Sequence, residues 1–125
     1  MLVIDDEVAA ATGLRALLRL DGYEVVASSE PRRALESLSR EHFDVVITDL
    51  EMPDVHGVEV VRAARAASSD TTVFVVTAYT GSPAIDAALA VGARAVFAKP
   101  LDYDALAAAM TKALGTDDDR HGELS

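Results

Sequence analysis

The sequence predicts a three-layer α/β domain in which helices cover both faces of one parallel five-stranded sheet. Short apolar runs of strand length alternate five times with segments of helical periodicity, which is typical of doubly wound folds. The length of 125 residues suits one such domain and is too short for two. We therefore expect any ligand at the carboxyl ends of the strands, where open sheets of this class bind them.

An apolar start and a leucine-rich face predict the first strand and the first helix. Met1–Ile4 is the first strand, and the first helix runs over Val8–Leu20 with leucines at helical spacing. Asp21-Gly22 ends this helix, because glycine readily adopts the backbone conformation that closes a helix. Gly13 lies inside the helix, where glycine costs about 1 kcal/mol relative to alanine, so we expect it to allow close packing on the sheet.

The middle elements continue the alternation. Glu24–Ala27 is the second strand, and the second helix spans Pro31–Arg40, because proline suits the first turn of a helix. The third strand is the apolar run Phe43–Asp49, and the third helix spans Gly57–Ala67. Asp49 therefore stands at the end of an apolar strand.

The last part of the domain repeats the pattern twice. Thr72–Thr77 is the fourth strand, and the helix Ser82–Val91 opens with a serine N-cap and a proline at the first helical position. Gly92 closes that helix, Ala95–Lys99 is the fifth strand, and the last helix spans Asp102–Leu114. We expect the domain to occupy residues 1–115.

Residues 116–125 differ in composition from the rest of the chain. Four acidic residues and one arginine give this segment a net charge of −3, and it contains a single leucine without periodicity. Such a segment cannot bury enough apolar surface to fold. We expect an acidic disordered tail or the start of a linker.

The overall charge of −10 argues against direct binding of nucleic acid or of an anionic membrane by this segment, since both need a basic surface. No apolar stretch approaches the roughly 20 residues of a membrane span, and the first apolar run is too short for a secretory signal. From these two observations we expect a soluble, cytoplasmic protein. The absence of cysteine excludes disulfides and thiolate metal sites but suits either redox environment.

Three carboxylates are predicted to meet at one edge of the sheet. Asp5 and Asp6 follow the first strand, and Asp49 ends the third. Parallel strands end at the same edge, so neighbouring strands would bring the three side chains together. Because anionic groups in one crevice repel one another, this cluster indicates a bound hard divalent cation, with Mg²⁺ as the expected ion.

Thr77 and Lys99 add a hydroxyl and an ammonium group at the ends of the fourth and fifth strands. Lys99 is one of two lysines among 11 basic residues, which indicates that this position requires a compact ammonium group. A carboxylate nucleophile, a metal, a hydroxyl and an ammonium group are the parts needed to accept a phosphoryl group and to hold its oxygens.

Together these motifs resemble the receiver domain of two-component response regulators, from Met1 to about Leu114. The matching motifs are Asp5-Asp6-Glu7, Asp49-Leu50-Glu51-Met52-Pro53, Thr77-Ala78, Gly92-Ala93 and Lys99-Pro100. The resemblance implies a CheY-like, flavodoxin-like (βα)5 sandwich with the strand order 2-1-3-4-5. In that order the first and third strands are neighbours, which brings the three acids together.

The resemblance also implies roles for the acidic residues. Asp49 is the phosphoacceptor. Mg²⁺, for which Mn²⁺ can substitute, is held by the side chains of Asp5, Asp6 and Asp49 and by the backbone carbonyl of Glu51. Glu51 and Tyr79 occupy positions that tune the lifetime of the phosphoryl group by admitting or blocking water.

Further residues are implied to bind the phosphoryl oxygens. They are Thr77, Ala78 and Lys99, and the bond between Lys99 and Pro100 is expected to be a cis peptide. Val96 departs from the family, because many receivers carry an aromatic switch residue at this position. The phenylalanine that follows it is expected on the opposite face of the strand.

The implied function is a phosphorylation switch rather than a classical enzyme. A sensor histidine kinase or a histidine phosphotransfer protein would donate the phosphoryl group, and the domain would assist its own phosphorylation and dephosphorylation. The resulting change would reach the surface of the fourth helix, the fifth strand and the fifth helix. That surface would act through a homodimer or through docking of an output partner.

Three other interpretations fit parts of the pattern. A haloacid dehalogenase-like phosphatase needs Asp-x-Asp-x-Thr at its nucleophile, whereas this chain has Asp49-Leu50-Glu51. A flavodoxin-like FMN protein needs a phosphate loop rich in Ser, Thr and Gly, whereas Asp5-Asp6-Glu7 would repel a phosphate group. The remaining alternative is a receiver-like interaction module that works without phosphorylation.

Overall fold

The computed structural model of the protein describes residues 1–115. Within this range the strands are β1 (Leu2–Ile4), β2 (Val26–Ser28), β3 (Val45–Asp49), β4 (Thr72–Thr77) and β5 (Ala95–Ala98). The helices are α1 (Val8–Leu20), α2 (Pro31–Arg40), α3 (Gly57–Ala67), α4 (Pro83–Ala90) and α5 (Tyr103–Leu114). No helix of this range is long and apolar enough to cross a membrane. The tail predicted at 116–125 lies outside the described residues.

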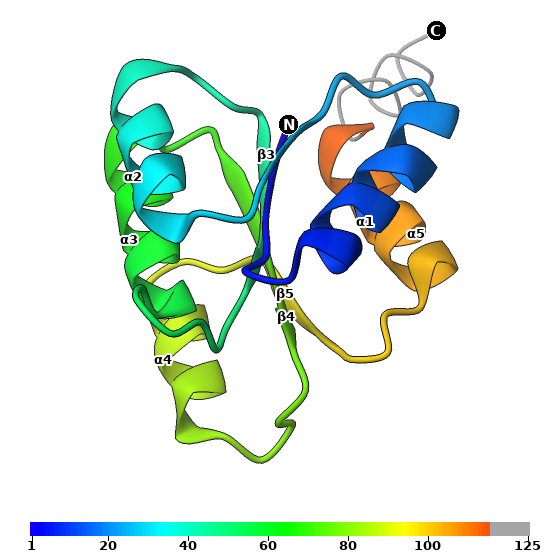
Figure 1. Cartoon of the computed structure of the whole chain (residues 1–125). Helices are drawn as coiled ribbons and strands as arrows, with labels where there is room; N and C mark the ends of the chain where they lie inside the picture. Colours follow the sequence, from blue (N-terminus) through cyan, green and yellow to red (C-terminus); the bar gives the residue numbers. More distant parts are fainter. Residues whose placement is uncertain (116–125) are drawn as a thin grey trace, which may run out of the picture.

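The strands form one parallel sheet in the order β2-β1-β3-β4-β5. Helices α1 and α5 cover one face of the sheet, and α2, α3 and α4 cover the other (Figure 1). This arrangement confirms the predicted doubly wound, CheY-like fold. Because the chain leaves β1 in one direction for β2 and then crosses to β3, the carboxyl ends of β1 and β3 border the crevice in which such sheets bind ligands.

The hydrophobic core has two layers, because neighbouring residues of a strand point to opposite faces of the sheet. Val46 and Val75 pack in the layer beneath α2, α3 and α4. Ile47 and Phe74 pack in the layer beneath α1 and α5. The burial of β3 and β4 on both faces accounts for their continuous apolar runs, and each fully buried large side chain contributes about 1.5–3 kcal/mol.

Five strand boundaries differ by one or two residues from their predicted positions. β1 begins one residue later than predicted, and β2 begins two residues later and ends one residue later. β3 begins two residues later, at Val45, and the carbonyl of Phe43 before it accepts a hydrogen bond from the Thr71 hydroxyl at 2.7 Å. β5 ends one residue earlier, since Pro100 has no N–H to extend the ladder.

Caps and glycines set the helix ends. Ser82 and Asp102 precede α4 and α5 as N-caps, with side chains that accept backbone N–H groups of the first turn. The predicted serine N-cap and the proline at the first helical position of α4 are confirmed, whereas α5 begins one residue later than predicted. Gly22 and Gly92 adopt positive φ values of 94° and 116° at the ends of α1 and α4, as predicted. Gly13, in contrast, is exposed, and a Cβ there would meet nothing within 4 Å. The prediction that Gly13 packs closely on the sheet was wrong.

Candidate functional site

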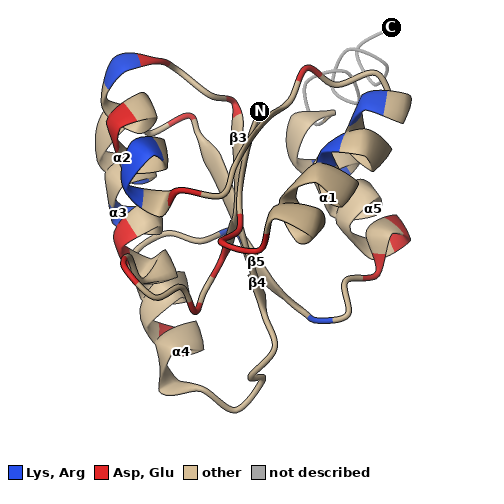
Figure 2. Cartoon of the chain, in the orientation of Figure 1, with Lys and Arg blue, Asp and Glu red and all other residues tan. Residues whose placement is uncertain are grey.

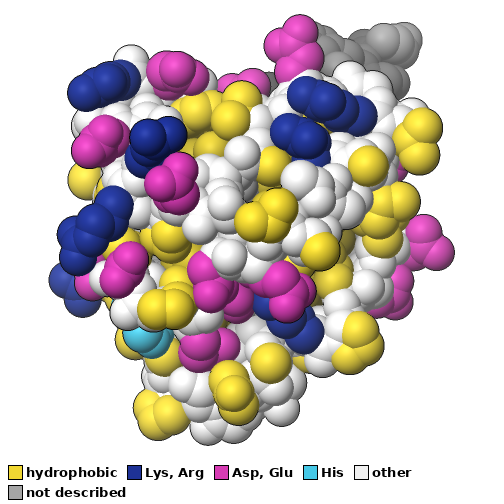
Figure 3. All heavy atoms as spheres, viewed as in Figure 1, with side chains coloured by type: hydrophobic (Ala, Val, Ile, Leu, Met, Phe, Trp, Pro, Cys, Tyr) yellow, Lys and Arg dark blue, Asp and Glu magenta, His cyan; other side chains and the backbone are white. Residues whose placement is uncertain are grey.

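The three acidic residues predicted to bind metal lie together at the carboxyl edge of the sheet. One carboxylate oxygen from each of Asp5, Asp6 and Asp49 lies within 4.8 Å of the others. Asp5 and Asp49 are buried, whereas Asp6 is exposed. Acidic residues occupy the loops at this edge (Figure 2), and acidic side chains gather on the surface in the middle of the view in Figure 3. Crowded carboxylate oxygens are the ligands that Mg²⁺ prefers, so the donor set fits a hard divalent cation.

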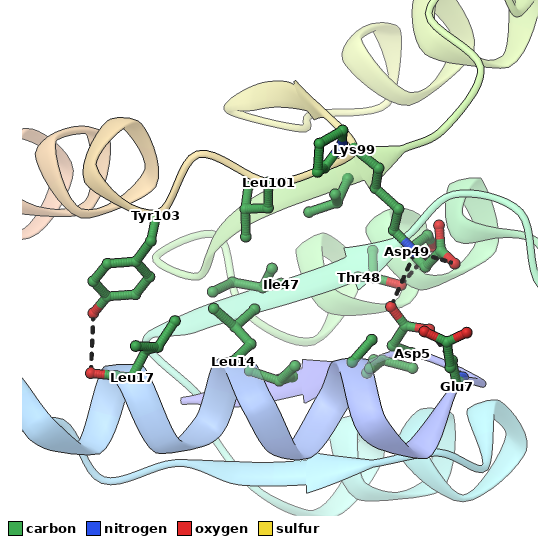
Figure 4. A pocket seen from close by; sticks show the side chains of 15 residues that line it. Asp5, Glu7, Leu14, Leu17, Ile47, Thr48, Asp49, Lys99, Leu101 and Tyr103 are labelled. Atoms are coloured by element: carbon green, nitrogen blue, oxygen red, sulfur yellow. Dashed lines mark hydrogen bonds and ion pairs between the residues drawn. The ribbon is translucent and has the colours of Figure 1, made fainter.

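Lys99 reaches this cluster from the end of β5. Its Nζ donates to Oδ2 of Asp49 at 3.1 Å and to Oδ2 of Asp5 at 3.2 Å (Figure 4). The other oxygen of Asp5 accepts the backbone N–H of Glu7 at 2.9 Å, which fixes the carboxylate at the start of α1. The peptide bond between Lys99 and Pro100 is cis. The ammonium group thus bridges both buried carboxylates and offsets part of their repulsion.

Burial and neighbouring charges shift two pKa values in this cluster. Burial raises the pKa of Asp49, the hydrogen bond and charge of Lys99 oppose the rise, and the charges of Asp5 and Glu51 add to it. Burial acts to lower the pKa of Lys99, but its hydrogen bonds with Asp49 and Asp5 outweigh that effect, so the pKa is raised. Lys99 therefore stays charged at neutral pH, whereas ionisation of Asp49 is disfavoured relative to an ordinary aspartate.

Thr77 ends β4 with a fully buried side chain. Its hydroxyl donates to Oε1 of Glu51 at 2.8 Å and accepts the backbone N–H of Tyr79 at 3.0 Å. Ala78 and Tyr79 are exposed in the connection between β4 and α4. The single hydroxyl proton of Thr77 is therefore directed at Glu51 and not at Asp49.

The position of the usual aromatic switch residue holds Val96. Its side chain packs in the core layer beneath α2, α3 and α4. Phe97 points to the other face, where its ring lies 5.9 Å from that of Phe74, measured between centroids. The predicted alternation is confirmed, and Phe97 does not supply an aromatic group at the switch position.

Gly57 packs closely against the end of β3, and the sequence analysis did not identify this role. It is buried at the start of α3, and its N–H donates to the carbonyl of Leu50 at 2.8 Å. A Cβ at this position would lie 2.6 Å from the backbone oxygen of Asp49 and 2.7 Å from the Cα of Leu50. Only glycine allows this approach. The one sequence signal was a glycine at the first position of a predicted helix.

A cavity of about 270 Å³ opens beside Asp49 and extends between α1 and the connection from β5 to α5. Leu14 and Leu17 line it, with Tyr103 at the far end (Figure 4). The Tyr103 hydroxyl lies 2.6 Å from Oδ2 of Asp21 and 3.2 Å from the carbonyl of Leu17, and it ties α5 to α1. Burial and the hydrogen bond to Asp21 raise the pKa of Tyr103 to about 12, so this hydroxyl stays protonated at neutral pH.

The fold and the site define a class of protein. A doubly wound sheet that carries buried aspartates, a lysine and a threonine at its carboxyl edge has the groups that hold a divalent cation and a phosphoryl group. The family model described as the response regulator receiver domain matches residues 1–111. The chain belongs to the response regulator receiver domain family.

Similar proteins extend this assignment. The transcriptional regulatory protein ZraR of Escherichia coli (strain K12) is 37% identical over 114 residues, which cover 91% of this chain and 26% of ZraR. A response regulator protein from Burkholderia pseudomallei, solved with a phosphorylated aspartic acid, a calcium ion and citrate, is 27% identical with a TM-score of 0.81 and covers 98% of this chain and 72% of its own. The beryllofluoride-activated NtrC4 receiver domain dimer is 28% identical with a TM-score of 0.81, over 90% of this chain and 93% of its own. The chain spans about a quarter of the length of ZraR.

Proposed function

We propose that Asp49 accepts a phosphoryl group from the phosphohistidine of a sensor histidine kinase or of a histidine phosphotransfer protein. The observation that carries this proposal is the place of the Asp49 carboxylate, which is buried beside two further acids and 3.1 Å from the Lys99 ammonium group. A carboxylate is a weak nucleophile, and positive charge on both sides of the incoming group is what allows it to react. The complete set of acids, lysine and threonine favours this switch over an interaction module that works without phosphorylation.

The acidic cluster is the proposed metal site. Asp5, Asp6 and Asp49 would hold the cation through their side chains, and Glu51 through its backbone carbonyl. Bound Mg²⁺ would supply positive charge beside the phosphoryl oxygens and would leave one oxygen of Asp49 free to react. We expect Mn²⁺ to substitute, because it also accepts hard oxygen ligands.

In the transfer step, the free oxygen of Asp49 forms a bond to phosphorus opposite the donor histidine. The P–N bond breaks, its electron pair stays on the imidazole, and the product is an aspartyl phosphate. Lys99 keeps its charge beside the new oxygens, and the hydroxyl of Thr77 and the backbone N–H of Ala78 donate to them. By these contacts the domain assists its own phosphorylation and later dephosphorylation without acting as a classical enzyme.

Two side chains near the acceptor are proposed to set the lifetime of the aspartyl phosphate. Hydrolysis requires a water molecule to approach phosphorus from the open side of the site. Glu51 lies two residues after Asp49, and Tyr79 is exposed two residues after Thr77. Their charge and bulk would govern how readily that water approaches.

The output is proposed to leave the domain through the surface of α4, β5 and α5. A homodimer formed there is one form of output, supported by the dimer of the activated NtrC4 receiver, and docking of a partner is the other. We place the receiver domain at residues 1–115, with 116–125 as a tail or linker, in the cytoplasm. The charge of −10 disfavours direct binding of nucleic acid or membrane by this segment.

Intact-mass measurement tests the proposed function. The protein is incubated with acetyl phosphate and Mg²⁺, beside an EDTA control and the Asp49→Asn variant. We expect a gain of one phosphoryl group in the wild type with Mg²⁺ and no gain in either control. Absence of an adduct in the wild type would contradict the proposal and favour the unregulated interaction module.

A further inference from the structure

The Thr77 hydroxyl, which would donate a hydrogen bond to a phosphoryl group on Asp49, already donates one to another side chain. Its one proton is donated to Oε1 of Glu51 at 2.8 Å, and Thr77 is fully buried. A hydroxyl can donate only one hydrogen bond at a time. A phosphoryl oxygen on Asp49 can therefore receive this proton only after the bond between Thr77 and Glu51 has broken.

The second carboxylate oxygen of Glu51 weakens the position in which Glu51 accepts the hydrogen bond from Thr77. Oε2 is buried, and none of the protein groups in residues 1–115 donates a hydrogen bond to it. A buried carboxylate oxygen without a donor destabilises its own position. The charge of Glu51 also acts on Asp49, since it contributes to the raised pKa of that residue. A phosphoryl group on Asp49 adds negative charge at the same place and would repel Glu51 toward solvent.

We infer that Glu51 is a positioning residue. In the unphosphorylated protein its side chain holds the Thr77 hydroxyl in a hydrogen bond, and when Asp49 is phosphorylated this side chain moves out to solvent and leaves the hydroxyl to the phosphoryl group. This inference rests on the proposed function. Tyr79 takes part directly, because its backbone N–H donates to the same hydroxyl at 3.0 Å. When the Thr77 hydroxyl changes its hydrogen-bond acceptor, the backbone at Tyr79 therefore moves with it. Tyr79 lies in the connection between β4 and α4, at the start of the proposed output surface.

A double-mutant cycle on beryllofluoride affinity tests this inference. Beryllofluoride replaces the phosphoryl group, and its dissociation constant is measured in saturating Mg²⁺ for the wild type, Glu51→Ala, Thr77→Val and the double variant. We expect Glu51→Ala to bind about tenfold more tightly than the wild type, which equals about 1.4 kcal/mol. In the Thr77→Val background the same change should have a clearly smaller effect, because it relieves only the charge repulsion and there is no hydroxyl to release.

Glu51→Gln separates hydrogen bonding from charge. Its side-chain oxygen still accepts from Thr77, so we expect a smaller gain in affinity than Glu51→Ala gives. A second measurement needs no Thr77 variant and no ligand: amide hydrogen exchange at Tyr79 should be faster in Glu51→Ala than in the wild type, because the chain of hydrogen bonds through Thr77 is broken.

The outcomes separate this inference from the proposed function. Equal gains for Glu51→Ala in both Thr77 backgrounds would overturn the inference, since they would show charge repulsion alone. Unchanged exchange at Tyr79 would also count against it. If the wild type itself failed to bind beryllofluoride in Mg²⁺, this result would contradict the proposed function and therefore also the inference that rests on it.

Discussion

Asp49 lies in surroundings that disfavour its own charge. Its pKa in the folded state is raised, so the folded state holds the proton more strongly than the unfolded chain does. As pH rises from the unfolded pKa through the folded pKa, the contribution of Asp49 to the free energy of unfolding therefore falls. The contribution of Lys99 changes in the same direction but at higher pH, because its pKa is also raised: the stability that it gives is present below the unfolded pKa and is lost as pH rises through the folded pKa.

Removal of the Asp49 charge should therefore stabilise the fold. We expect Asp49→Asn to raise the free energy of unfolding by about 1 kcal/mol at pH 7 in EDTA, measured by urea denaturation. The difference should shrink as pH is lowered through the pKa of Asp49. Asp44→Asn is the matched control, because this exposed residue just before β3 should change stability by less than about 0.5 kcal/mol. A loss of stability in Asp49→Asn would show that the pair with Lys99 outweighs burial and repulsion.

At the level of the elements, the start of α3 packs directly against the end of β3, which carries the proposed phosphoacceptor Asp49. Gly57 brings the first turn of α3 against the backbone of Asp49 and Leu50, where no side chain fits. The contact fixes the direction in which the chain leaves β3. The backbone carbonyl of Glu51, a proposed metal ligand, lies just beyond this point.

Alanine at two glycines should have opposite effects. Gly57→Ala would force backbone atoms apart, and we expect it to lower the free energy of unfolding by about 3 kcal/mol and to weaken phosphorylation. Gly13→Ala places a methyl group in open space on α1, and we expect a gain of up to about 1 kcal/mol. Urea denaturation of both variants measures the pair. A Gly57→Ala protein as stable as the wild type would show that α3 can shift without effect.

The sequence predicted the elements well because apolar alternation is a property of the chain itself. Strand ends also predicted that Asp5, Asp6 and Asp49 would meet, since parallel strands share an edge. Strand boundaries were less predictable, because they depend on pairing with residues that are distant in the sequence. The role of Gly57 and the hydrogen bond from Thr77 to Glu51 depend on packing and on side-chain rotamers, which no sequence pattern encodes.

In the whole molecule, acidic residues lie in the loops at the site and also on several helices and other loops (Figure 2), and three of them meet at the site. The chain carries a net charge of −10, and the buried part of the acidic cluster is compensated within residues 1–115 by one lysine. A cation bound at this cluster would therefore stabilise the folded state and not the unfolded chain.

Thermal unfolding with Mg²⁺ measures this effect. At a concentration 100 times the dissociation constant, a ligand that binds only the folded state stabilises it by about 2.7 kcal/mol, so we expect a rise of several degrees in Tm. A potassium salt of equal ionic strength is the control for screening, and Asp6→Asn should lose most of the rise. Equal Tm values in the two salts would contradict the metal site.

Phosphorylation of Asp49 is expected to change the conformation of the domain, and amide NMR detects such a change residue by residue. Spectra of the labelled protein in Mg²⁺ are recorded before and after addition of acetyl phosphate, beside Asp49→Asn. We predict shifts at Asp49, in the connection from Thr77 to Ser82 and on α4, β5 and α5 of the wild type, and none of these in the variant. Shifts that also appear in Asp49→Asn, or a wild type that gains the phosphoryl group without any change on α4, β5 and α5, would contradict the account.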